Sequence, residues 1–159
     1  MKYDDASWHA GADFPKDLQP DDAATHIGMF VAWALPHGFA RPRPLKKNAD
    51  AVSAVQERRM TGRQFVLGHC GRTFSDTDLN APGHAFAGAY YEKGYMADWQ
   101  AFAAARGLTS DYHVPDSWAT FDDLARILDL RVSEWESGNV EYAPLPASLL
   151  RKRGWWPFG

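Results

Sequence analysis

The stretch from residue 118 to residue 135 constrains the fold more than any other part of this chain. Its apolar side chains recur at alternating spacings of three and four residues, which is the period of an α-helix. They are Trp118, Phe121, Ala125, Leu128, Val132 and Trp135. Side chains at this spacing form one stripe, which leaves water only by packing against other helices. The pattern therefore predicts a long helix, ended near Gly138, inside a helical domain.

Further helices are predicted upstream, between loops that are rich in proline and glycine. Pro36 ends the first of them, and a capping box of Thr61 and Gln64 opens the third. Gly94 lies in the middle of the fourth, where it predicts a kink or a close contact with another helix. The expected ranges are about 22–35, 49–60, 61–71 and 82–107.

These patterns predict a single mainly α domain over residues 1–159, a compact bundle of five or six helices with little or no β structure. A chain of this length can bury a substantial core without disulfides. Any strands are expected as a short pair near the sequence RQFVLGHCGRTF. The residues expected in the core are Ile27, Phe30, Val31, Trp118, Phe121, Leu128 and Val132.

Cysteine content and hydropathy bear on where the protein is found. Cys70 is the only cysteine, which excludes an internal disulfide, and the sequence MKYDDASWHA lacks the basic start and apolar run of a secretory signal. The longest uninterrupted apolar run, Ile27 to Leu35, has nine residues, whereas a membrane-spanning helix needs about 20. We therefore expect a cytoplasmic protein without a membrane partner.

Charge is distributed unevenly along the chain. From Thr73 to Tyr142 there are twelve Asp and Glu residues against four Lys and Arg residues. If the acidic side chains share one face, that face repels nucleic acid and attracts basic proteins. Alternatively, they are ordinary solvated residues on helix surfaces. The acidic residues predicted to bind a partner protein are Asp76, Asp78, Asp111, Asp116, Asp122, Asp123 and Glu134.

Most motifs that carry a known chemistry are absent from the sequence. It has no G-x-x-x-x-G-K-[ST] phosphate loop, no G-x-G-x-x-G, no H-E-x-x-H, no C-x-x-C pair and no G-x-S-x-G nucleophile elbow. We therefore expect no cofactor, and a binding protein rather than an enzyme.

The stretch from Trp8 to Trp33 is the one place where the residue types fit metal binding. Possible oxygen and nitrogen ligands there are Asp4, Asp5, His9, Asp13 and His26. His9, His26 and one carboxylate, for which we select Asp13, could hold a divalent ion with an open position for water. The alternative is structural, with His26 hydrogen-bonded inside the core. The residues expected to line a pocket are Asp5, Trp8, His9, Asp13, His26 and Trp33.

Several segments resemble a family of small uncharacterised bacterial proteins. They are YDDASWHAGADFP, THIGMFVAW, DLNAPGHAFAGAYYEKGYMADW, YHVPDSWATFDDL and the C-terminal GWWPF, and together they extend over most of the chain. The family pattern is YDD-x-x-WH-x-GGDFP followed by THIGMF-x-AW, and Ala12 departs from it where a second glycine is more usual. The resemblance implies an association with bacterial toxin–immunity systems.

Three functions follow as hypotheses. The first is an immunity-type binding protein, without catalytic residues of its own, that blocks a cognate bacterial toxin through an acidic, aromatic-rich surface. The second is a small metal-dependent hydrolase that uses His9, Asp13 and His26. The third is a regulatory protein-interaction module that has no toxin as its partner.

The C-terminal sequence RKRGWWPFG combines three cations with Trp155, Trp156 and Phe158. Burying these aromatic side chains would stabilise the fold by several kcal/mol. We therefore expect the tail to fold back over the core. The alternative, a membrane-surface anchor, usually needs a larger apolar face or a second signal.

Overall fold

The structure, a computed structural model, describes residues 1–153 apart from the side chains of Arg43 and Pro44. Helices make up most of it, beside one antiparallel sheet of two strands, and the predicted mainly α fold is confirmed. The predicted packing of Trp155, Trp156 and Phe158 falls outside the described residues and stays a prediction.

The described residues form two strands, α-helices, 3₁₀ helices and a π-helix. The strands are β1 (Lys2–Asp5) and β2 (Thr73–Ser75). The α-helices are α1 (Ala6–His9), α2 (Thr25–Ala34), α3 (Pro42–Lys47), α4 (Ala49–Gln56), α5 (Gly62–His69), α6 (Ala81–Phe86), α7 (Met96–Ala105), α8 (Trp118–Glu136) and α9 (Ala147–Leu150). The 3₁₀ helices are η1 (Pro20–Ala24), η2 (Asp76–Asp78) and η4 (Asp111–His113), and η3 (Ala87–Tyr95) is a π-helix. No helix within residues 1–153 is long and apolar enough to cross a bilayer.

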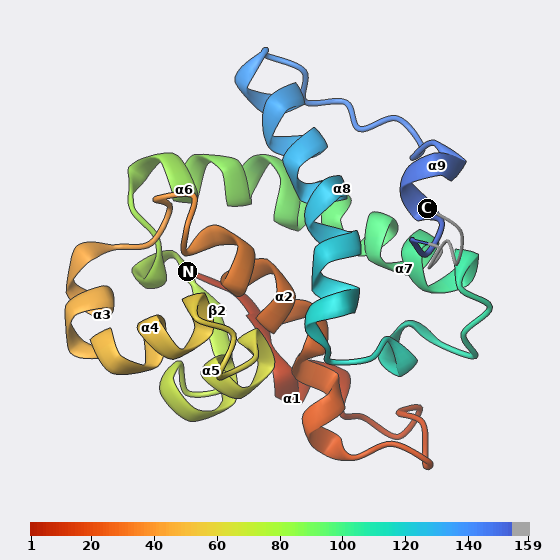
Figure 1. Ribbon diagram of the computed structural model, residues 1–159, viewed down its shortest axis with the longest axis horizontal. Coiled ribbons are helices and arrows are strands. Elements are labelled where there is room, and N and C mark those ends of the chain that lie inside the picture. Colours follow the sequence, from red (N-terminus) through yellow and green to blue (C-terminus); the bar gives the residue numbers. More distant parts are fainter. Residues whose placement is uncertain (154–159) are drawn as a thin grey trace, which may run out of the picture.

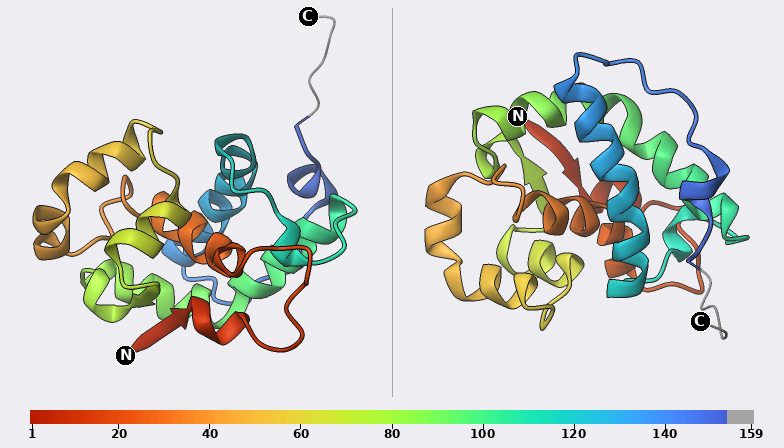
Figure 2. Two further views of the ribbon diagram at one scale, coloured as in Figure 1. Left: turned by 90° about the horizontal axis from the view of Figure 1, so that it is seen from below. Right: turned by 45° about the horizontal axis from the view of Figure 1, so that its top comes forward.

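Helix α2 lies at the centre of the fold, with α3, α4 and α5 to one side of it and α8 to the other (Figures 1 and 2). Nine of its ten residues are buried. Ile27 and Phe30 are in the core as predicted, and Val31 is partly buried. The helix meets α5 at Gly28 and Gly62, where the two backbones touch. A methyl group on either glycine would collide with backbone atoms of the other helix.

Helix α8 confirms the long helix that the apolar stripe predicted, and it spans 19 residues. Its most deeply buried apolar side chains are Leu124, Ile127 and Leu128, which have no exposed surface. Trp118 and Phe121, which the stripe also placed in the core, are only partly buried. Periodicity does not distinguish two adjacent faces of one helix, and the packing around α8 decides between them.

The sheet joins the first residues of the chain to a segment 70 positions away, since Asp4 pairs with Phe74 in antiparallel register. Strand β2 begins at the end of the segment RQFVLGHCGRTF, but its partner is β1, because Gly62–His69 forms α5. A bulge interrupts β1 between Lys2 and Asp4. Successive side chains of a regular strand alternate between two faces, whereas here Tyr3 and Asp4 are both buried. The bulge thereby brings a carboxylate into the interior.

The helices α6, η3 and α7 follow one another without a break from Ala81 to Ala105, close to the helix predicted over residues 82–107 (green in Figure 1). The middle segment η3 is a π-helix of nine residues. π-Helical turns are rare and occur frequently at functional sites. The close contact expected at Gly94 is made with the rings of Tyr90 and Tyr142, and not with another helix.

Candidate functional site

A buried carboxylate in β1 is the centre of the strongest candidate site. The side chain of Asp4 lies in the interior, with only 5% of the residue exposed. A buried carboxylate is costly unless hydrogen-bond donors or cations surround it. The position of Asp4 follows from the bulge in β1, so the local irregularity of the strand creates the site.

Asp4 accepts hydrogen bonds from three side chains and one backbone amide. Its Oδ1 atom accepts from Nε2 of His9 at 2.6 Å and from the backbone N–H of Asp5 at 2.8 Å. Its Oδ2 atom accepts from Nε2 of His26 at 2.9 Å and from the hydroxyl of Tyr91 at 2.7 Å. Since these side chains belong to α1, α2 and η3, the carboxylate ties together elements from three parts of the chain.

The π-helix η3 supplies two buried tyrosines to the site. Tyr91 donates to Asp4, and the hydroxyl of Tyr95 donates to the backbone carbonyl of His26 at 2.7 Å. The two rings stack with centroids 4.9 Å apart. One turn of η3 therefore fixes both the carboxylate and the segment of α2 that carries an imidazole.

His9 connects the buried cluster with the surface. Its side chain is 18% exposed, whereas that of His26 is 1% exposed. The two imidazoles meet edge to face with centroids 4.5 Å apart, and Nδ1 of His9 lies 3.2 Å from the hydroxyl of Tyr112. A shallow depression opens at this point, lined by Trp8, His9, Gly11, Ala12, Asp13, Phe14 and Tyr112. An ion or a small molecule would reach the cluster from this side.

The electrostatics favour a charged carboxylate beside a protonated imidazole. Burial alone would raise the pKa of Asp4, but the hydrogen bonds from His26, His9 and Tyr91 outweigh it and hold that pKa far below its usual range. The hydrogen bond to Asp4 raises the pKa of His9, against the opposing effect of burial. Burial also raises the pKa of Tyr91 well above its ordinary value, so this phenol stays a hydrogen-bond donor.

Asp4, His9 and His26 are also arranged as metal ligands. One ligand atom from each residue can be chosen so that all three lie within 4.8 Å of one another. A carboxylate and two imidazoles are donors that suit zinc and related divalent ions. Among the His, Cys, Asp and Glu side chains of residues 1–153, this is the group of three or more whose ligand atoms lie that close together.

The structure brings His9 and His26 together, as the metal hypothesis required, but it places Asp4 rather than Asp13 between them. Asp13 is exposed and lines the depression with Trp8. Asp4 was among the possible ligands, but the sequence does not single it out, because adjacent aspartates in YDD look alike and only the bulge turns one of them inward.

Asp5 and Trp33, which we also expected to line the pocket, lie outside this cluster. The carboxylate of Asp5 pairs with Lys2 at 2.7 Å and caps α1. Trp33 is buried, and its Nε1 donates to Asp129 at 2.9 Å.

Most of the acidic residues predicted to bind a partner are paired within the chain. The pairs are Asp76 with the N-terminal amino group, Asp116 with Arg63, Asp122 with Arg58, Asp123 with Arg106 and Glu134 with Arg131. Asp78 caps η2 by accepting from the backbone of Ser75, and Asp111 begins η4. These residues are spread over η2, η4, α8 and the loop before α8, and their partners neutralise much of their charge.

Comparison with known proteins identifies a family for this chain. A family model described as Domain of unknown function (DUF7832) matches residues 2–114. The matched range contains the Asp4 cluster and the depression beside it, and it ends before α8 begins. No curated protein and no solved structure matches the chain.

Proposed function

Because this chain belongs to the DUF7832 family, whose description names no activity, we propose its function from the Asp4 site. Asp4, His9 and His26 bind a divalent metal ion, with zinc the best fit, and the protein is a small metal-dependent hydrolase. One observation carries the proposal: ligand atoms of the three residues converge within 4.8 Å, and one of the imidazoles borders an open depression.

The donor set is that of a catalytic zinc site rather than a structural one. Catalytic zinc typically has three protein ligands and keeps a fourth position for water, whose pKa the metal lowers. Nε2 of each imidazole now donates to Asp4, so an ion would displace those protons and bind more weakly at low pH. Tyr91 on Asp4 and Tyr112 near His9 supply the outer hydrogen bonds that orient metal ligands.

Asp13 has the chemistry and the position of a general base. It is exposed in the wall of the depression that His9 borders. In the proposed reaction water adds to a carbonyl or phosphoryl group, Asp13 accepts the proton of that water, and the bond to the leaving group breaks. Trp8, Phe14 and Tyr112 line the same depression and offer aromatic surface to a substrate.

The first experiment measures zinc binding by protein purified without a metal-affinity tag. We expect about one equivalent of Zn²⁺ per chain, in competition with a chromophoric chelator. His9→Gln and His26→Gln should each weaken binding by about tenfold or more, because each removes a ligand. Wild-type binding of less than about a tenth of an equivalent would overturn the proposal.

His113→Gln is the matched control. His113 also pairs with an aspartate, Asp17, at 2.9 Å, but it belongs to no three-residue ligand group in residues 1–153. Its loss should leave zinc affinity unchanged. If His26→Gln disturbs the buried core, circular dichroism will show it, and the partly exposed His9 then gives the decisive variant.

Activity is tested separately with chromogenic esters and phosphodiesters. Hydrolysis should stop on chelation and return with Zn²⁺. Asp13→Asn should abolish hydrolysis without changing zinc affinity, because Asp13 lines the depression but is not one of the three ligands. If the protein binds zinc but hydrolyses none of these substrates, the metal site is supported and the hydrolase proposal is wrong.

An immunity-type binding protein is our second proposal, and the exposed indole of Trp8 favours it. Trp8 is 60% exposed, and exposed tryptophans are frequent anchors of protein interfaces. The partner would be a cognate bacterial toxin. Because the predicted acidic residues are largely paired within the chain, we place the toxin-binding surface around Trp8, Asp13 and Asp111.

Co-expression with a toxin encoded by an adjacent gene tests this second proposal. The protein should restore growth, and Trp8→Ala should abolish the rescue while Val140→Ala, which also removes exposed apolar surface, should not. A pull-down that returns a housekeeping protein instead would favour the regulatory interaction module.

A further inference from the structure

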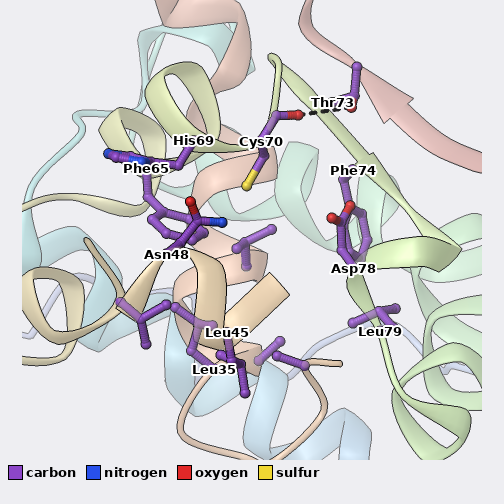
Figure 3. Close-up of a pocket in the computed structure, with 14 residues that line it drawn as sticks. Leu35, Leu45, Asn48, Phe65, His69, Cys70, Thr73, Phe74, Asp78 and Leu79 are labelled. Carbon is purple, nitrogen blue, oxygen red and sulfur yellow. Dashed lines mark hydrogen bonds between the residues drawn. The ribbon is translucent and has the colours of Figure 1, made fainter. Parts of the chain in front are cut away.

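A second pocket lies between α2, α4, α5 and β2, and none of its lining residues belongs to the Asp4 cluster (Figure 3). Its inner chamber encloses about 50 Å³. The wall of this chamber is mostly apolar and includes Val31, Leu35, Val52, Phe65, Phe74 and Leu79. An apolar chamber of this kind favours an apolar group over water.

Next to the inner chamber lies a wider, more polar and more open hollow of about 530 Å³, which we call the outer chamber. The two chambers are adjacent, because they share the lining residues Asn48, His69, Cys70, Thr73 and Asp78. Figure 3 shows the sulfur of Cys70 directed into the space between Asn48 and Phe74. The two chambers together therefore form one pocket with an apolar end and a polar mouth.

Two cationic residues lie at the polar mouth of this pocket. Arg41 and Lys47 line the outer chamber, and neither side chain forms an ion pair in the part of the chain that the structure describes. Asp78 is the one acidic residue lining either chamber among the described residues, and the backbone N–H and hydroxyl of Ser75 donate to it at 2.8 and 3.1 Å. The mouth thus carries more positive than negative charge.

We propose that this pocket binds a small molecule with a short apolar tail and an anionic head, either a carboxylate or a phosphate. A water-sized group needs about 10–15 Å³, so the inner chamber holds the last few carbon atoms of the tail. The rest of the ligand occupies the outer chamber, where its head reaches Arg41 and Lys47. The planar fork of an arginine matches carboxylate and phosphate oxygens equally well. The proposal is independent of the metal site.

Calorimetric titration of the full chain with three matched six-carbon probes tests the head group. Hexanoate or hexyl phosphate should bind, and the stronger of the two identifies the head, whereas neutral hexanamide should bind about tenfold more weakly or worse. Arg41→Gln and Lys47→Gln should each weaken binding of the anion by about threefold or more. Lys46→Gln should have no effect, because Lys46 is an adjacent lysine that lines neither chamber.

Acetate and the thiol of Cys70 test the tail and the location. Acetate should bind far more weakly than hexanoate, since each buried CH₂ group strengthens binding by about fourfold. The bound anion should also slow alkylation of Cys70, which lines both chambers. Equal binding of hexanamide and the anions, equal binding of acetate and hexanoate, or an unchanged alkylation rate would each overturn the proposal.

Discussion

At the scale of single residues, the thiol of Cys70 gives a direct test of its surroundings. Burial raises its pKa to about 12, and the charge of Asp78 acts in the same direction. Only the thiolate reacts, so at pH 8 about one molecule in ten thousand is reactive, against about one in four for an ordinary thiol. We expect iodoacetamide to alkylate native Cys70 about a thousandfold more slowly than Cys70 in the urea-unfolded chain.

The pH dependence separates ionisation from access. The rate for native Cys70 should rise about tenfold per pH unit from pH 8 to pH 11, because the thiolate fraction rises in proportion. Mass spectrometry of the alkylated protein follows the reaction. A rate that levels off near pH 9 would contradict the raised pKa.

Substitution of a single residue, Leu128, tests the packing of α8. Its side chain is fully buried, so Leu128→Ala should cost about 2–5 kcal/mol through lost transfer free energy and a residual cavity. Val140, which is 57% exposed, provides the control, and Val140→Ala should change stability by about 0.5 kcal/mol or less. Urea unfolding measures both. Equal effects of the two substitutions would show that the face of α8 is wrongly assigned.

At the scale of elements, the crossing of α2 and α5 depends on a pair of glycines. A side chain on Gly62 would collide with the backbone of Gly28, whereas a side chain on Gly68 in the same helix would meet no atom within 4 Å. Gly62→Ala should therefore destabilise the fold by about 1–3 kcal/mol or more. Gly68→Ala should stabilise it by about 0.5–1 kcal/mol, because alanine favours a helix.

Thermal melting of the two variants tests this contrast. Gly62→Ala should lower the midpoint and Gly68→Ala should raise it slightly. A protein that tolerates alanine at Gly62 would show that α2 and α5 do not meet backbone to backbone.

The elements also show what the sequence can predict. The capping box of Thr61 and Gln64 opens α5 as expected, and the apolar stripe marks α8, because both signals come from residues a few positions apart. The pairing of β1 with β2 was not predicted, since its partners are 70 residues apart and β2 has only three residues. The site was predicted only in part, for the same reason. His9 and His26 lie on recognisable segments, whereas the inward position of Asp4 depends on a bulge and that of Tyr91 on a π-helix.

At the scale of the whole molecule, Arg131 of α8 joins three separate parts of the chain. Its guanidinium donates to both carboxylate oxygens of Asp98 in α7, at 2.8 and 2.9 Å. It also donates to the backbone carbonyl of Ala143 at 2.7 Å, in the segment that runs from α8 to α9 (Figure 1). Arg131 and Asp98 are both buried, so neither charge has water as a substitute partner.

Arg131→Ala should cost about 3–5 kcal/mol, because it leaves the carboxylate of Asp98 buried and unpaired. Asp98→Asn in the same chain should recover part of the loss by removing that charge. Arg126→Ala is the control on the same helix, since Arg126 makes no ion pair with any described residue, and it should change stability by about 0.5 kcal/mol or less. Urea unfolding of the wild type, Arg131→Ala, Asp98→Asn and the double variant measures the coupling, and additive effects would contradict it.

The strand β1 has a consequence for the order in which this protein takes shape during synthesis. Asp4 leaves the ribosome long before Phe74, its partner in the sheet, and longer still before Tyr91, whose hydroxyl donates a hydrogen bond to it. Contacts between residues so far apart in sequence form slowly, because the intervening chain must first be closed into a loop. The imidazoles of His9 and His26 can thus be exposed on the nascent chain before β1 has paired with β2 and fixed the carboxylate of Asp4. The chemistry of the site becomes available only after the chain has emerged as far as Tyr91.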